Sequence, residues 1–250
     1  EASPNVSFQL YAMINYRNRL LMGQYPTGEL FEIVGDEIVQ LAGSPPRPAN
    51  ASGTAREAQT LALYRGDLFV GVWPWGEVWR WHDTDSTWEF IGRLFENPPL
   101  SPEITAPYEQ EMNQQNEAVN NLWGQRVTSL IPYKDILIAS TSNKNGTPYD
   151  ESRFPFLAQG RWEEYGKLHR LYLPGNLAAP IQWSGKPIAF EVQLTDNTLR
   201  LIQDGRLIGT TRIPKDSATQ SKLGDIRWGQ GVFGPFSGKI IETSWSRQSQ

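Results

Sequence analysis

The sequence contains no cysteine and only two histidines among its 250 residues. The absence of cysteine excludes disulfide bonds, thiolate metal ligands and cysteine nucleophiles. Because zinc centres are built from clusters of cysteine and histidine, the composition also argues against a structural zinc site. It leaves the cellular compartment open, since both cytosolic proteins and many secreted bacterial proteins manage without cysteine.

An excess of positive charge and long apolar runs are missing as well. The chain carries 23 basic and 27 acidic residues, a net charge of −4, so we do not expect nucleic acid as a partner. No run reaches the roughly eighteen apolar residues that a membrane-spanning helix needs. The serine-hydrolase, nucleotide-binding loop and dinucleotide-binding motifs are absent, so those chemistries have no support in the sequence.

The main feature that is present is an internal repeat. Residues 16–32 read YRNRLLMGQYPTGELFE, and 48 positions later residues 64–80 read YRGDLFVGVWPWGEVWR. A third, more divergent copy begins at Tyr133, where YKDILIAS aligns without a gap against YRGDLFVG. The copies also end alike, with WEFIGRL from Trp88 and WEEYGKL from Trp162.

The repeat predicts an all-β fold made of β-propeller blades. Alternating apolar and polar residues, interrupted by Gly, Pro, Asn and Asp, predict four short strands in each repeat unit. The three units span residues 7–43, 58–95 and 126–168, and the last two strands of the third unit are expected at 154–159 and 161–168. Four short strands in a repeat of this length, with no long helical pattern, are typical of propeller blades. A Pro-rich link separates the first two units, and residues 96–122 are expected to form an insertion with a short polar helix.

Residues 1–168 are therefore predicted to be a propeller domain, and residues 169–250 have a different character. Residues 188–213 predict a three-stranded meander, because Asp-Asn and Asp-Gly dipeptides separate its strands. LRLIQDGRLI at 199–208, IRWG at 226–229 and FSGKI at 236–240 carry a resemblance over residues 188–246. This stretch resembles the C-terminal half of laminin-G-like, concanavalin-type lectin domains. The resemblance implies antiparallel strands and a carbohydrate ligand, although the first half of such a domain has no counterpart here.

Over residues 7–168 the repeats are similar to the propeller arrays of secreted bacterial proteins, which implies an extracytoplasmic location. Three blades are fewer than the usual four to eight that close a propeller. The tail can supply irregular blades, another copy or partner chain can complete the ring, or the sequence can be part of a longer protein. We favour a longer protein, because it accounts both for a propeller with too few blades and for a tail that resembles only half of a lectin domain. It predicts apolar edges that something must cover.

An aromatic cluster is the candidate carbohydrate-binding site. Trp73 and Trp75 flank Pro74 in a predicted turn, and Trp81 and Tyr25 extend the cluster. Exposed indole rings stack on the apolar faces of sugars, so these four residues are the predicted sugar contacts. Trp79 is instead expected to lie in the core between blades, because Phe31 occupies the same position in the first copy.

Four residues are weak candidates for catalysis, and two for calcium. His82 beside Arg80 on one strand face suits the base and carboxylate clamp of a polysaccharide lyase. Glu29 and Glu77 recur in the repeat, which favours a structural role over the paired carboxylates of a glycosidase. Otherwise no cofactor is expected, and Asp196 and Asp204 leave calcium binding open because they lie in loops of the tail.

The sequence leads to three functional hypotheses. The leading one is an extracytoplasmic, bacterial propeller module that binds or acts on a polysaccharide or glycan. The second is an enzyme, either a polysaccharide lyase or a glycoside hydrolase, with its site at the propeller axis. The third is an assembly subunit whose open β edges are covered by another protein chain.

Overall fold

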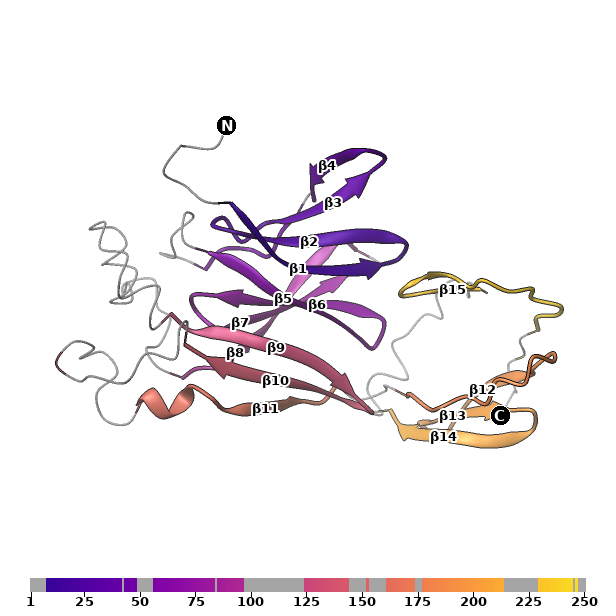
Figure 1. The fold of residues 1–250 in the computed structure, drawn as a ribbon. Coiled ribbons are helices and arrows are strands. Elements are labelled where there is room, and N and C mark those ends of the chain that lie inside the picture. Colours follow the sequence, from indigo (N-terminus) through magenta and orange to yellow (C-terminus); the bar gives the residue numbers. More distant parts are fainter. Residues whose placement is uncertain are drawn as a thin grey trace. The chain divides into compact units, whose positions relative to one another are not determined.

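A computed structural model describes residues 8–41, 43–48, 56–83, 85–96, 124–143, 152, 161–173, 177–213, 229–244 and 246 (Figure 1). The all-β class is confirmed, because every regular element in these ranges is a strand apart from one short 3₁₀ helix. No helix in the described part of the chain has the length and apolar character to cross a membrane. The chain divides into one compact unit of residues 1–14 and 20–173 and another of residues 15–19 and 174–250.

The first two repeats each form a four-stranded antiparallel sheet. The first sheet has the strand order β1 (Gln9–Tyr16), β2 (Arg19–Tyr25), β3 (Leu30–Val34) and β4 (Glu37–Gln40). The second sheet has the order β5 (Glu57–Tyr64), β6 (Asp67–Trp73), β7 (Glu77–His82) and β8 (Thr87–Arg93). Each strand pairs with the next one in sequence because tight turns join them, as at Arg65 and Gly66, which both have positive φ.

The third repeat forms a sheet of three strands within the described residues, in the order β11 (Leu168–Leu171), β10 (Ile136–Ser142) and β9 (Arg126–Tyr133). The prediction of a strand over residues 161–168 is wrong. Arg161–Glu164 is the 3₁₀ helix η2, and Thr141 Oγ1 holds the segment after it by accepting from Lys167 N at 3.0 Å. The predicted strand at 154–159 and nearly all of the predicted insertion at 96–122 lie outside the described residues.

The meander predicted in the tail is confirmed. It consists of β12 (Phe190–Thr195), β13 (Thr198–Gln203) and β14 (Arg206–Arg212), in that order. Its turns lie at Asp196 and Asn197 and at Asp204 and Gly205, all with positive φ. The short strands β15 (Gln230–Gly231) and β16 (Gly234–Pro235) form a separate pair. Residues 226–228 of the lectin-like pattern lie outside the described ranges, so the lectin arrangement stays a prediction.

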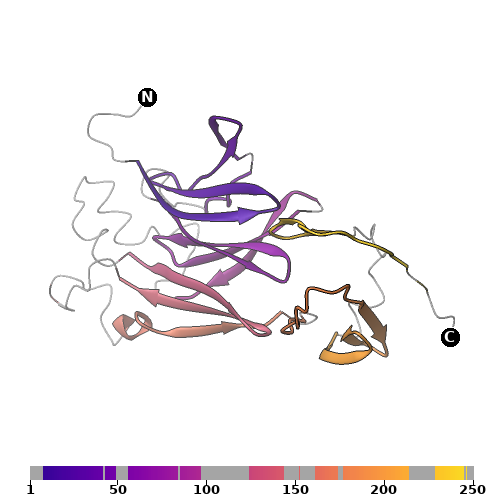
Figure 2. The same ribbon diagram turned by 45° about the vertical axis from the view of Figure 1, so that its right-hand side comes forward.

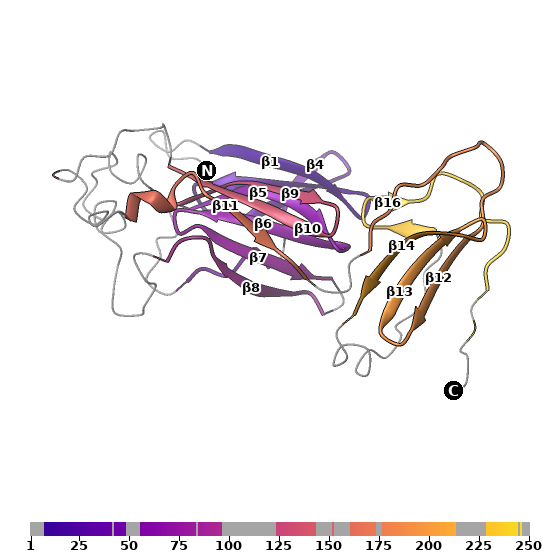
Figure 3. The same ribbon diagram turned by 90° about the horizontal axis from the view of Figure 1, so that it is seen from below.

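Glycine allows the first three sheets to approach one another closely. Gly23 on β2 lies so near the carbonyl oxygen of Ala58 on β5 that a side chain would collide with it. Gly71 on β6 occupies the equivalent position 48 residues later, and a Cβ there would lie 2.6 Å from Cβ of Val127 on β9. The first and second sheets therefore each use a glycine to accept the first strand of the next sheet. Figures 1 and 2 show the three sheets in sequence order within their unit, and Figure 3 shows the same sheets from below.

Backbone hydrogen bonds between sheets follow the same repeat. Arg56 N donates to Pro26 O at 2.6 Å, and Gln125 N donates to Pro74 O at 2.8 Å. The residue after each proline forms a parallel β-bridge with the residue that donates to that proline. These bridges join Thr27 to Arg56 and Trp75 to Gln125. The first and second sheets, and the second and third, are therefore joined by the same type of backbone contact.

The core between the second and third sheets is apolar. Its buried members come from strands β5, β6, β7, β9 and β10, and they are Ala62, Tyr64, Phe69, Val78, Val127, Leu130, Leu137 and Ala139. The Tyr64 hydroxyl spans this interface, donating to Asp135 O at 2.6 Å and accepting from Leu173 N at 3.3 Å. Along β10, the residues that alternate with Leu137 and Ala139 point to the opposite face of the sheet, away from this core.

Candidate functional site

The tryptophans predicted to bind sugar are buried. Trp73 and Trp75 are 0% and 1% exposed, Trp81 is also buried, and Tyr25 is half-buried with its ring centroid 6.1 Å from that of Trp73. The expectation of an exposed aromatic turn is therefore wrong. The physical reason is that this turn bonds to the start of the next sheet, and the Arg93 guanidinium covers the Trp75 ring at 5.2 Å.

Glu77 is also part of the interior. Its Oε2 lies 2.6 Å from Arg56 Nη2 and accepts a hydrogen bond of 2.6 Å from Trp79 Nε1. Burial raises the pKa of the Glu77 carboxyl, and Arg56, Trp79 and Arg93 oppose that rise. Trp79 is buried as predicted. Glu77 thus serves as a structural anchor, enclosed away from any substrate.

Arg80 and His82 share a face of the second sheet, as predicted, but carboxylates occupy both. Arg80 lies 2.7 Å from Asp67 Oδ2 and 3.2 Å from Glu89 Oε2, while His82 Nε2 lies 2.8 Å from the same Glu89 oxygen. The arginine assigned to clamp a uronate is therefore already paired on both sides. Sequence inspection missed Asp67 and Glu89 because their proximity comes from the register of β6, β7 and β8.

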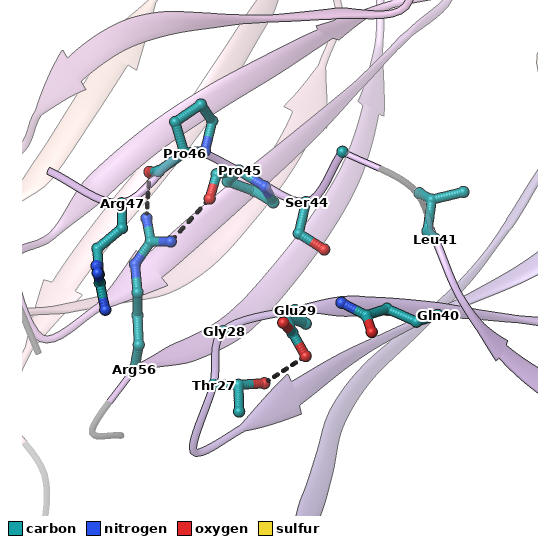
Figure 4. A pocket seen from close by; sticks show the side chains of 11 residues that line it. Thr27, Gly28, Glu29, Gln40, Leu41, Ser44, Pro45, Pro46, Arg47 and Arg56 are labelled. Carbon is teal, nitrogen blue, oxygen red and sulfur yellow. Dashed lines mark hydrogen bonds between the residues drawn. The ribbon is translucent and has the colours of Figure 1, made fainter. Parts of the chain in front are cut away.

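Glu29 lies on the wall of an open pocket of about 650 Å³ beside the first sheet (Figure 4). The pocket is lined by the turn before β3, the end of β4 and the Pro-rich link, that is by Thr27, Gly28, Glu29, Gln40, Leu41, Gly43, Ser44, Pro45, Pro46, Arg47 and Arg56. Thr27 Oγ1 donates to Glu29 Oε2 at 3.1 Å, and Arg56 donates to the carbonyls of Pro45 and Pro46 at 2.8 and 2.9 Å. Hydroxyl, amide, carboxylate and guanidinium groups can all bind a polar ligand.

Sequence inspection missed most of this pocket. Arg47 and Arg56 belong to the link and its boundary, which the sequence marks only as a break between repeats. The structure brings them to Glu29 because Arg56 N bonds to Pro26 O, next to the turn that carries Thr27. A guanidinium directly after a Pro-rich link was the one available signal, and it is a weak one.

The predicted calcium candidates do not form one site. Asp196 and Asp204 lie in the turns at opposite ends of β13 (Thr198–Gln203). An extended strand of this length separates them by about 20 Å. Asp204 Oδ1 instead accepts from Ala189 N at 2.9 Å, which ties the end of β13 to the residue before β12. Among the described residues, no group of three His, Cys, Asp or Glu side chains is arranged to hold a metal ion.

The outer face of the first sheet carries an apolar surface that has no equivalent on the second sheet. Met22 pairs with Phe31 and Ile33 with Ile38 across the strands, so these residues lie on the face opposite Gly23. Leu20, Ile33 and Ile38 are exposed there by 38%, 41% and 62%, whereas Met22 on the same face is only 3% exposed. On the second sheet, Leu68 and Trp81 stand 48 residues after Leu20 and Ile33, and they are only 0% and 8% exposed.

The third sheet also has an open apolar face, on the side away from the core. Ile138 pairs with Ile131 and Ser140 with Leu168, and these positions alternate with the buried Leu137 and Ala139. Ile131, Tyr133 and Leu168 are exposed. In the part of the chain that the structure describes, the first and third sheets thus each have one open face, on the side away from the second sheet. No family model matches this sequence, and no curated protein sequence matches it.

Proposed function

We propose that the chain is an assembly module in which residues 8–173 form three consecutive propeller blades that add to further blades. The first, second and third sheets are the three blades. The support is the recurring contact between a small residue on the second strand of one sheet and the first strand of the next, Gly23 with Ala58 and Gly71 with Val127. Such nearest-neighbour contacts are the means by which repeat proteins extend.

The main support for this proposal is that residues at the same position of the repeat are exposed on the first sheet and buried on the second. Leu20 is 38% exposed while Leu68, its equivalent, is 0% exposed because the first sheet lies beside the second. Apolar residues on both faces of a sheet indicate that both faces contact protein. An exposed surface of this kind on a folded domain marks an interaction site. The open face of the first blade is therefore expected to receive another four-stranded sheet of the same type.

An added blade tests the proposal. A second copy of residues 8–55 placed directly ahead of residue 8 keeps the 48-residue spacing of the repeat. Because the chain has no cysteine, a single Leu20→Cys in the original copy reports burial through its rate of maleimide labelling. We expect the added blade to slow that labelling by about tenfold or more, since a covered thiol reacts only when the structure opens locally.

Thr87→Cys supplies the matched control, because Thr87 is exposed on the second sheet and the new blade does not reach it. Its labelling rate should be the same in the parent and the extended chain. Equal labelling of position 20 in the two chains, with both folded by circular dichroism, would show that the face does not accept a blade.

A second candidate function is binding of a polysaccharide or glycan in the pocket of Figure 4. The observation that favours it is an open polar cavity of about 650 Å³ with Glu29, Gln40 and Arg47 in its lining. Sugar hydroxyls bind such planar polar groups through paired hydrogen bonds. For the enzyme hypotheses, Arg80 and Glu77 are already committed to ion pairs, whereas Glu29 lines this pocket.

Affinity electrophoresis through polysaccharide gels tests this second candidate. Glu29→Gln combined with Arg47→Ala is expected to abolish retardation, because it removes a charged acceptor and a charged donor from the pocket wall. Arg170→Ala, at an exposed position on the third sheet, is the control and should leave retardation unchanged. Equal retardation of the double variant and the parent chain would rule out this pocket as the sugar site.

A further inference from the structure

We infer that the open face of the first blade binds the open face of the third blade on a second copy of the chain, so that two copies close one ring. The inference rests on the proposed function and names its partner. The chain already contains this kind of interface twice, between its first and second sheets and between its second and third sheets. The open face of the third sheet corresponds to one side of that interface, and the open face of the first sheet corresponds to the other.

The repeat register specifies which residues meet. Gly23 contacts Ala58, and the same step along the repeat gives the contact of Gly71 with Val127. Ser140 aligns with Gly71 in the third copy, and Leu10 aligns with Ala58 in the first copy. The next contact in this series therefore places Ser140 of one chain on Leu10 of the other.

The two surfaces suit this contact in polarity, and because Ser140 has a Cβ where Gly71 has none, the sheets at this junction lie farther apart than at the glycine contacts. Ser140 is a small residue on the open face of the third sheet, where it pairs with the exposed Leu168. Leu10 is 44% exposed, whereas Ala58, its counterpart, is 0% exposed beneath Gly23. Burying apolar side chains from both chains supplies the driving force for association.

The number of sheets also fits. Three blades from each of two chains make six, within the four to eight with which propellers close. The contact joins unlike faces, so it is head to tail, and a head-to-tail contact produces a finite ring when its rotation closes. Two copies with one such contact at each junction leave no blade face open.

Disulfide trapping in the cysteine-free chain tests the inference. Leu10→Cys and Ser140→Cys, made separately and then mixed under oxidising conditions, should give a disulfide-linked dimer on a non-reducing gel. A Cβ built at Gly71 would lie 2.6 Å from Val127 Cβ, so the wider junction that Ser140 requires moves the two Cβ atoms toward the separation of about 3.5–4.5 Å that a disulfide needs. Leu10→Cys mixed with Thr87→Cys is the control pair and should remain unlinked, because Thr87 lies outside both open faces.

Sedimentation of the unmodified chain gives a second readout that needs no variant. A species of twice the chain mass is expected at micromolar concentration, and Leu20→Glu should shift it to the monomer while circular dichroism stays unchanged. A monomer at all concentrations, or a dimer without the bond between positions 10 and 140, would overturn the inference. If this inference is overturned but the added blade still slows the labelling of position 20, the assembly proposal stands and only a second copy is excluded as the partner. If the added blade does not slow that labelling, both the assembly proposal and this inference are wrong.

Discussion

Gly71→Val is expected to destabilise the protein by about 1–3 kcal/mol or more, because it forces apart the second and third sheets. A Cβ at this position would lie 2.5 Å from Thr60 Cγ2 and 2.6 Å from Val127 Cβ. Both neighbours belong to packed strands, so neither can move aside without disturbing the core that contains Phe69 and Leu137. Urea unfolding followed by tryptophan fluorescence measures the change in the free energy of unfolding.

Gly23→Val is expected to cost at least as much, because the atom it meets is the backbone carbonyl oxygen of Ala58, which has no alternative rotamer. Ser140→Val is the matched control at the same position of the repeat. It should change the free energy of unfolding of the monomer by less than about 0.5 kcal/mol, since no sheet among the described residues covers Ser140. Equal costs at positions 71 and 140 would contradict the stacking of the sheets through their glycines.

Removing either member of the buried pair of Arg56 and Glu77 is expected to have the largest effect. Arg56→Met or Glu77→Gln should each lower the free energy of unfolding by about 3–5 kcal/mol, because each leaves a buried ionisable group without its partner. The two side chains are 3% and 0% exposed. Arg56 also holds the carbonyls of Pro45 and Pro46, so its loss releases the link from the second sheet.

A double-mutant cycle measures the coupling between the two residues, and the double variant should cost less than the sum of the single ones. Glu89→Gln is the control, because its carboxylate pairs with Arg80 near the surface and should contribute about 1 kcal/mol or less. A cost as small for Glu77→Gln as for Glu89→Gln would show that the buried pair does not hold the sheets together.

The sequence by itself determined the all-β class, the strands of the first two repeats and the meander at 188–213. These elements depend on local signals, namely alternating side chains and turns at Arg65, Gly66, Asp204 and Gly205, whose backbone has positive φ. The repeat also placed Trp79 in the interior correctly. Local patterns of this kind fix strand positions because side-chain direction alternates along a strand whatever lies beyond it.

Only the tertiary structure decided which side chains remain accessible. Trp73 and Trp75 are in a turn that resembles an exposed loop in the sequence, yet they are buried because the next sheet bonds to Pro74 and Arg93 covers Trp75. The residues that bury these rings, and those that form the pocket around Glu29, come from separate segments of the chain. Burial depends on what packs against a residue, and that partner is chosen by sheet stacking rather than by its sequence neighbours.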